Sequence, residues 1–151
     1  MKLNGPFTYQ LTFNETKILS VTNPEGGNTM SGPAAQKTPK LYVISDDGVP
    51  VYVGITKQPL RSRLRGGFDE NGPNGYHGYA WRRELERATI DVWLQDLGQP
   101  DEIETIEAEV VFLIRQQYDQ WPKFQTEIHF HRSDAGHRST ARQILDHFKR
   151  R

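Results

Sequence analysis

The feature of the sequence that most constrains the fold is a pair of short apolar runs joined by a four-residue turn. Leu41 to Ile44 is followed by Ser-Asp-Asp-Gly, and the chain then continues with Val49 to Ile55. The glycine of this turn supplies the backbone angles that a tight turn requires. The two runs are therefore predicted to be adjacent antiparallel strands of one hairpin.

Helix and strand patterns alternate after this hairpin. Pro59 marks a helix start, and Leu60 and Leu64 are spaced one helical turn apart. The apolar residues at 90, 92 and 94 recur with the period of a strand. The expected elements are a helix over 59–65 that Gly66 stops, a loop over 67–78, a helix over 79–87, a strand over 90–94, a long helix opened by Pro100 and Asp101, a short strand over 127–131 and a helix over 141–150.

The residues before Lys40 contain two different patterns. Apolar residues alternate with polar ones from Phe7 to Phe13, and a second short apolar stretch lies at 17–21. These runs predict a hairpin, which is either a separate arm or a pair of extra strands. The segment 23–39 is rich in Gly, Pro, Ser, Thr and Asn, so we expect it to be a flexible connection.

The element order predicts an α+β fold with a small antiparallel three-stranded β-sheet flanked by helices and an N-terminal β-hairpin extension. A chain of 151 residues has room for one compact core. We expect three segments: the hairpin and connection at 1–39, the compact domain at 40–131, and a basic helical tail at 132–151.

Composition excludes several classes of protein and site. The chain has no cysteine, which rules out disulfides, thiolate metal sites and a cysteine nucleophile. The start Met-Lys-Leu-Asn-Gly-Pro lacks an apolar signal core, and the longest aliphatic and aromatic run, Val110 to Ile114, is too short to span a bilayer. We therefore expect a cytoplasmic protein with no membrane contact.

The charge of the chain gives no overall attraction for a polyanion, because 19 basic residues balance 19 acidic ones. Binding to DNA would therefore depend on local clusters of basic residues. Such clusters are present, although each one taken alone also fits a solvated helix face. They are Lys57, Arg61, Arg63 and Arg65; Arg82, Arg83 and Arg87; and the basic residues of 138–151.

Some residues of the compact domain are suited to chemistry. Tyr42 and Tyr52 lie on the two hairpin strands, where phenols usually serve packing. Gly54 either ends its strand or allows backbone or ligand to approach closely. Glu107 lies beside the apolar stripe of the long helix, so its carboxylate needs a partner, either a metal ion or a nearby arginine.

Together these residues form an ordered pattern: Leu41-Tyr42-Val43, then Val51-Tyr52-Val53-Gly54-Ile55-Thr56, then Leu60-Arg61-Ser62-Arg63-Leu64, and later Ile106-Glu107-Ala108-Glu109-Val110-Val111. The pattern resembles the GIY-YIG nuclease superfamily over about residues 40–125. That resemblance implies a three-stranded sheet with flanking helices and an endonuclease that hydrolyses DNA phosphodiester bonds.

The resemblance also implies a role for each matching residue. Tyr42 and Tyr52 match the two family tyrosines, of which one activates the attacking water and the other orients the water or the phosphate. Arg63 matches the arginine that stabilises the pentavalent phosphate. Glu107 matches the glutamate that holds Mg²⁺ or Mn²⁺, with Glu109 as its rival.

The sequence departs from the family pattern at two positions. Where the family often has His or Tyr, one turn after the arginine, this chain has Gly67; His77, Tyr76 or Tyr79 are candidates to replace it, and we name His77 as a catalytic candidate. Where the family has Asn after a proline, this chain has Gln125. The residues expected to contact DNA are Lys57, Arg61, Arg65, Arg82, Arg83 and Gln125.

Other functions stay open at this point. His129 and His131 alternate on the expected short strand with His137 close behind, which suits a zinc or iron site. The two departures also fit a catalytically inactive module that binds DNA or a protein partner. The N-terminal hairpin either clamps DNA or pairs two copies of the chain as a homodimer.

Overall fold

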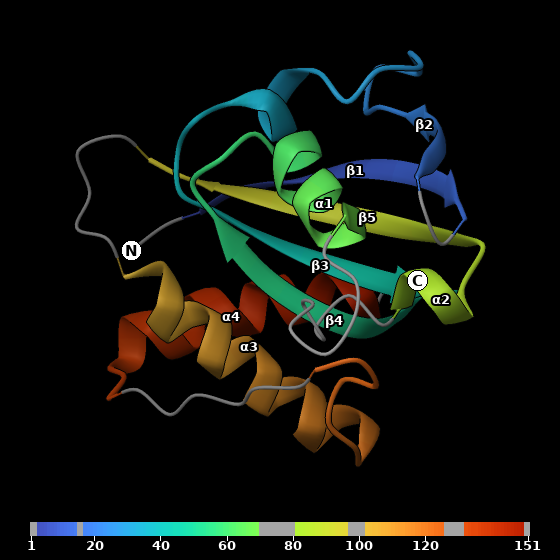
Figure 1. The fold of residues 1–151 in the computed structure, drawn as a ribbon. Coiled ribbons are helices and arrows are strands. Elements are labelled where there is room, and N and C mark those ends of the chain that lie inside the picture. The colour runs from blue at the N-terminus through green and yellow to red at the C-terminus, as the bar shows by residue number, and fades with distance from the viewer. Residues whose placement is uncertain (1–2, 15–16, 70–80, 97–101, 126–131, 150–151) are drawn as a thin grey trace.

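The structure is a computed structural model that describes residues 3–14, 17–69, 81–96, 102–125 and 132–149. Its strands are β1 (Leu3–Phe13), β2 (Ile18–Thr22), β3 (Lys40–Asp46), β4 (Val49–Thr56) and β5 (Arg87–Gln95). Its helices are the short 3-10 helix η1 (Gly32–Ala35), α1 (Leu60–Asp69), α2 (Trp81–Glu84), α3 (Ile103–Tyr118) and α4 (Ala135–Lys149) (Figure 1). The predicted α+β class is confirmed.

The sheet of the described residues has five strands in the order β2-β1-β5-β3-β4, and every neighbouring pair is antiparallel. The prediction of a three-stranded sheet is therefore wrong in its strand count. The N-terminal hairpin supplies the two extra strands, because β1 pairs with β5 from Leu3 opposite Gln95 to Thr12 opposite Arg87. This pairing buries apolar side chains of β1 that a free arm would expose to water.

The predicted hairpin of β3 and β4 is confirmed. Tyr42 lies opposite Gly54 and Ile44 lies opposite Tyr52. Both turn residues have positive φ, at 53° for Asp47 and 84° for Gly48. Two consecutive positive φ angles match the right-handed twist of the flanking strands.

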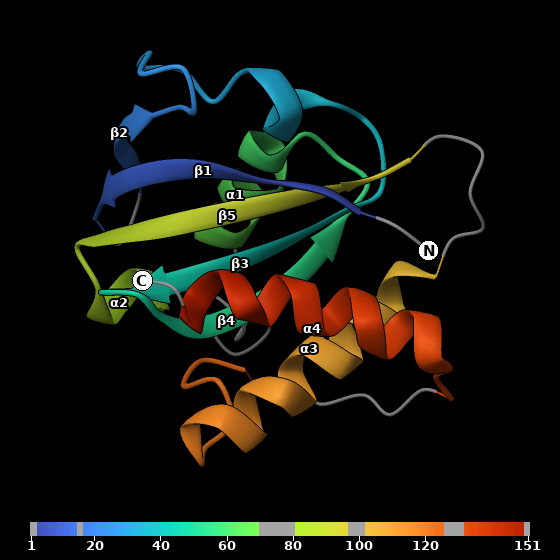
Figure 2. The same cartoon turned by 180° about the vertical axis from the view of Figure 1, so that it is seen from behind.

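The two faces of the sheet carry separate hydrophobic clusters. Tyr42, Tyr52 and Ile90 pack on one face with Leu60 and Leu64 of α1. On the other face, buried residues of β3, β4 and β5 pack with those of α3 and α4. Figure 1 shows α1 in front of the sheet, and Figure 2, the view from behind, shows α4 beside the β3–β4 side of the sheet. Side chains alternate between these faces because the strand period is two residues.

Helix boundaries differ from the prediction at α1 and α2. Helix α1 continues past Gly66 to Asp69, because one glycine weakens a helix by only about 1 kcal/mol. Helix α2 covers only Trp81–Glu84, because the chain from Arg87 onward pairs with β1 as part of β5.

The expected cap Asp101 and the expected strand 127–131 lie outside the described residues. Within the described part of the chain, no helix has the length and apolar character needed to cross a membrane.

Helix α4 starts earlier than expected and has a well-defined cap. Asp134 Oδ1 accepts a hydrogen bond from the His137 backbone N–H (2.9 Å), and His137 Nδ1 accepts one from the Asp134 N–H (3.0 Å). The N–H of His137 holds the pKa of Asp134 below its usual value. Because Nδ1 accepts, the ring proton is on Nε2, which lies 2.8 Å from Glu102 Oε2. This capping box joins the starts of α3 and α4.

The segment expected to be a flexible connection packs against the sheet. Met30 and Ala34 are buried, and the Tyr9 hydroxyl donates to the Ser31 carbonyl (2.6 Å) while accepting from the Ala34 N–H (3.1 Å). Burial raises the pKa of the Tyr9 phenol, so this hydroxyl stays protonated as a donor. A single buried phenol therefore ties η1 to β1, which sequence composition did not indicate.

We expect Tyr9→Phe to lower the free energy of unfolding by about 1–3 kcal/mol, because the buried Ser31 carbonyl and Ala34 N–H lose their partner. Urea denaturation measures the change. Tyr118→Phe is the matched control, since no hydrogen bond of the Tyr118 hydroxyl to another described residue is present. Equal stability of the two variants would contradict the role of the Tyr9 hydroxyl.

Candidate active site

Two phenols lie side by side at the centre of the candidate site. The rings of Tyr42 on β3 and Tyr52 on β4 are 6.1 Å apart between centroids and tilted by 45°. Their fractional exposures are 0% and 4%, so both belong to the core under α1. The two tyrosines lie close together because they occupy one face of one hairpin.

Gly54 makes room for the phenol of Tyr42. A Cβ atom at Gly54 would lie 2.5 Å from both Cζ and Oη of Tyr42, far inside van der Waals contact. Gly54 also lies directly opposite Tyr42 in the ladder, so the Tyr42 ring extends across the glycine. Of the two explanations that the sequence left open, close approach is the correct one, and the approaching group is a side chain.

Arg63 is carried by α1, which packs on the same face as the phenols. Leu60 and Leu64 are fully buried against this face and fix the rotation of the helix. The Arg63 backbone N–H donates to the Pro59 carbonyl (3.2 Å) and closes the first helical turn. The Arg63 side chain is half-buried, in contrast to that of the exposed Arg61.

Glu107 comes from the opposite layer. It lies on α3, between core residues that pack with Val43 and Val53 on the other face of the sheet, and it is half-buried. Glu109, its rival, has Oε1 engaged by the Ser133 hydroxyl at 2.6 Å, on the side of α3 that faces the start of α4. Two positions apart on a helix, the two carboxylates point in different directions, so they do not form one site.

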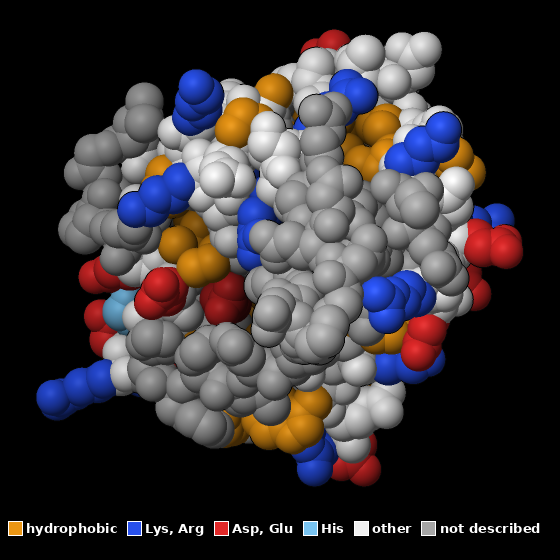
Figure 3. Space-filling view, in the orientation of Figure 1, with side chains coloured by type: hydrophobic (Ala, Val, Ile, Leu, Met, Phe, Trp, Pro, Cys, Tyr) orange, Lys and Arg blue, Asp and Glu red, His pale blue; other side chains and the backbone are white. Residues whose placement is uncertain are grey.

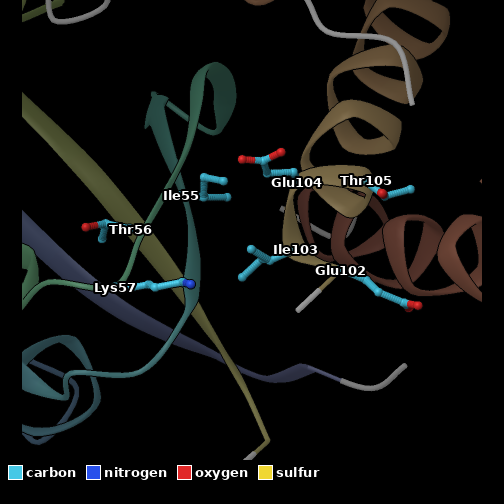
Figure 4. Close-up of a pocket in the computed structure, with 7 residues that line it drawn as sticks. All are labelled: Ile55, Thr56, Lys57, Glu102, Ile103, Glu104 and Thr105. Atoms are coloured by element: carbon cyan, nitrogen blue, oxygen red, sulfur yellow. The ribbon is translucent and has the colours of Figure 1, made fainter. Parts of the chain in front are cut away.

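A pocket of about 420 Å³ lies between the end of β4 and the first turn of α3. Figure 4 shows Lys57 on one side of it and Glu104 on the other, with Ile55 and Ile103 between them. In Figure 3 the corresponding face shows a recess left of centre with basic side chains above and acidic ones below. Glu107 follows Ile103 by four residues, so it lies one helical turn along α3 from the pocket lining.

Gln125 has a structural role at the edge of the sheet. Its Oε1 accepts from the Val53 N–H (3.0 Å), and its Nε2 donates to the Val53 carbonyl (3.1 Å). The neighbouring Phe124 N–H donates to the Val51 carbonyl (2.9 Å). The Gln125 amide thus replaces the missing neighbour of β4, and its expected contact with DNA stays a prediction.

The basic residues expected to bind DNA occupy different places on the surface. Lys57 lines the pocket described above. Arg61 lines a groove beside β2, and Arg83 lines a second groove beside the β1–β2 hairpin. The side chains of Arg65 and Arg82, and the whole of His77, lie outside the described residues.

Known proteins add no neighbour to these observations. No family model, no curated protein and no solved structure matches this chain. The functional assignment therefore rests on the geometry and chemistry of the site.

The described carboxylates do not form a metal-binding cluster. Among the described residues no group of three or more His, Cys, Asp or Glu side chains is arranged to hold a metal. A single carboxylate such as Glu107 suits Mg²⁺, which binds oxygen and keeps several of its waters. Both ring nitrogens of His137, one of the three residues of the zinc alternative, contact other residues, Asp134 and Glu102. The other two, His129 and His131, lie outside the described residues.

No pattern in the sequence indicated Lys40 as part of this region. Lys40 is fully buried at the start of β3, and its ammonium contacts three backbone carbonyls. A lysine at a strand start normally extends into water. Its burial depends on the positions of the carbonyls of Gln36, Thr38 and Gln58, which tertiary structure sets.

We expect Gly54→Ala to destabilise the protein by about 1–3 kcal/mol, because the new methyl group collides with the Tyr42 ring. The effect should nearly vanish when Tyr42 is replaced by Ala, which removes the ring. Denaturation of both single variants and the double variant gives the coupling energy. Additive effects would show that the methyl group clashes elsewhere.

The Lys40 ammonium predicts a change of stability at alkaline pH. Burial lowers the pKa of Lys40 to about 8, whereas an unfolded lysine has a pKa of about 10.4. Between these values the unfolded chain binds a proton that the folded chain has released, so the free energy of unfolding rises with pH. Urea titrations across this range should show the rise in the wild type and not in Lys40→Met; parallel curves would contradict it.

Proposed function

We propose that this chain is a metal-dependent endonuclease with a GIY-YIG-like domain, which hydrolyses phosphodiester bonds of DNA. The observation that carries the proposal is the pair of adjacent phenols, Tyr42 and Tyr52, with Gly54 shaped to receive the first.

The surroundings of the phenols support the same function. Helix α1 packs on the phenol face and carries Arg63. The pocket between the end of β4 and the start of α3 has Lys57 on one side and the acidic start of α3 on the other. A phosphodiester is an anion that gains further negative charge in the transition state, so guanidinium and ammonium groups stabilise it. Glu107 lies one turn along α3 from that pocket.

Each residue has a distinct role in the proposed reaction. One phenol takes the proton of the attacking water while the other orients the water or the phosphate. Arg63 neutralises charge on the phosphate oxygens as the phosphorus becomes pentavalent. Glu107 would hold Mg²⁺ or Mn²⁺, which supplies charge neutralisation at the leaving 3′ oxygen. The neutral net charge of the chain means that DNA would be held by local basic residues.

One observation favours a second function. Tyr42 and Tyr52 are almost completely buried, as packing tyrosines usually are, so a phosphate would reach them only after the side chains above them move. A non-catalytic module that binds DNA through its basic residues needs no such movement. Its interaction would weaken with salt in proportion to the phosphates that it neutralises.

The test is cleavage of supercoiled plasmid with Mg²⁺ or Mn²⁺. We expect nicking by the wild type, abolished by EDTA, and a fall of about 100-fold or more in Glu107→Gln and Tyr52→Phe, because each loses a group that acts in the transition state. Glu109→Gln is the matched control, since its amide oxygen can still accept the Ser133 hydrogen bond.

Each alternative outcome identifies another reading of the site. Loss of activity in Glu109→Gln with activity kept in Glu107→Gln would exchange the two glutamates. Intact plasmid with salt-sensitive binding would establish the DNA-binding module. A wild type that neither cleaves nor binds the plasmid would exclude DNA as the ligand, and a protein partner would remain.

A further inference from the structure

Lys40 makes an unusual set of interactions for a lysine. Its side chain is 0% exposed, and its Nζ donates to the carbonyls of Gln36 (2.6 Å), Thr38 (3.0 Å) and Gln58 (2.7 Å). An ammonium has three N–H donors, so these three carbonyls match its whole capacity. A buried charge is tolerated only when it is hydrogen-bonded in this way.

The three carbonyls belong to two segments that lie on the phenol side of the sheet. Gln36 is the C-terminal cap of η1, and Thr38 lies just before β3. Gln58 lies just before Pro59, at the start of α1. The ammonium therefore joins the end of η1 to the start of α1, the helix that carries Arg63.

The Gln58 residue is held at both of its backbone polar groups. Its carbonyl accepts from Lys40, and its N–H donates to the Thr56 hydroxyl at 3.1 Å. Thr56 is the residue opposite Lys40 in the β3–β4 ladder. The path of the chain from the end of β4 into α1 is thus fixed by a pair of residues that face each other in the sheet.

The contacts of Lys40 and Thr56 with Gln58, called the clamp below, lie near Tyr42 in the sequence of β3. Lys40 and Tyr42 are two residues apart on β3, so their side chains leave the same face. The first turn of α1 follows the clamp directly, since Arg63 N–H bonds to the Pro59 carbonyl. A shift at Gln58 is transmitted through this turn to the Arg63 side chain.

We propose that Lys40 is a positioning residue of the candidate active site, whose ammonium sets the place of α1 and thereby of Arg63 relative to Tyr42 and Tyr52. The proposal rests on the nuclease function for its effect on turnover. Its effect on α1 is independent of that function. A lysine that only filled space would be replaceable by an apolar side chain of similar length, whereas the three carbonyls require N–H donors.

The test is chemical rescue of Lys40→Ala by ethylammonium, with Lys40→Met as the matched control in which the cavity stays filled. In plasmid nicking we expect kcat to fall about 10- to 100-fold in both variants with little change of KM, because a misplaced Arg63 acts on the transition state. Ethylammonium should restore Lys40→Ala at least about threefold and leave Lys40→Met unchanged. Tetramethylammonium, which has the same charge and no N–H, should restore neither.

Hydrogen exchange of the amides of residues 63 and 64, the first that bond within the first turn of α1, reports on α1 directly, without reference to catalysis. We expect exchange about tenfold faster in Lys40→Ala and slowed again by ethylammonium. If Lys40→Ala does not fold, Thr56→Val removes the other half of the clamp, and a smaller effect in the same direction is expected, with Thr56→Ser restoring the wild-type value.

The outcomes separate this inference from the proposed function. Wild-type nicking and wild-type exchange in both Lys40 variants would overturn the positioning role and leave the nuclease standing. Equal rescue by ethylammonium and tetramethylammonium would also overturn it, since donors would then be irrelevant. An inactive wild type, combined with amine-specific restoration of α1 exchange, would remove the nuclease and support the role of Lys40 in placing α1.

Discussion

The pairing of β5 with strands on both of its sides is the interaction on which the rest of the structure depends. β5 lies between β1 and β3, so it joins the N-terminal hairpin to the β3–β4 hairpin. Neither hairpin has a stable face alone, since two-stranded sheets are marginal in water. The residues of β5 contribute to both hydrophobic clusters, with Ile90 and Val92 on one face and Trp93 on the other. The hairpin that carries the two phenols therefore depends on β5, a strand that begins about thirty residues after β4 ends.

The residues of the candidate site come from both faces of the sheet. The alternation of β3 sends Lys40 and Tyr42 to the layer of α1, while Leu41 and Val43 anchor α3 and α4. Glu107 belongs to the second of these layers and the phenols to the first. The carboxylate and the phenols therefore lie on opposite faces of the sheet. The pocket between the end of β4 and the start of α3 is lined by Lys57 and Glu104 but by neither phenol nor Glu107.

Local patterns in the sequence were sufficient for the β3–β4 hairpin, its turn, the long helix α3 and the α+β class. These features depend on residues close together in the chain, such as the consecutive Asp47 and Gly48. What the sequence could not reveal depends on distant contacts: the pairing of β1 with β5, the packing of Met30 and Ala34, and the end of the second helix at Glu84. In the site, the sequence placed Tyr42 and Tyr52 on the two hairpin strands, and the register of the ladder brings their rings together. The three carbonyls around Lys40 and the pairing of Gln125 with Val53 could not be predicted, because each joins segments that no periodicity relates.

The Gln125 amide has a consequence for how copies of the protein meet. In the described residues β2 has a strand neighbour on one side only, and the middle of β4 is occupied by Phe124 and Gln125. A sheet that grows by edge addition needs two open edges, and this one offers a single short edge. Two copies that joined through β2 would leave no further edge at either end. Of the sheet edges in the described residues, β2 is therefore the one along which a second copy could pair.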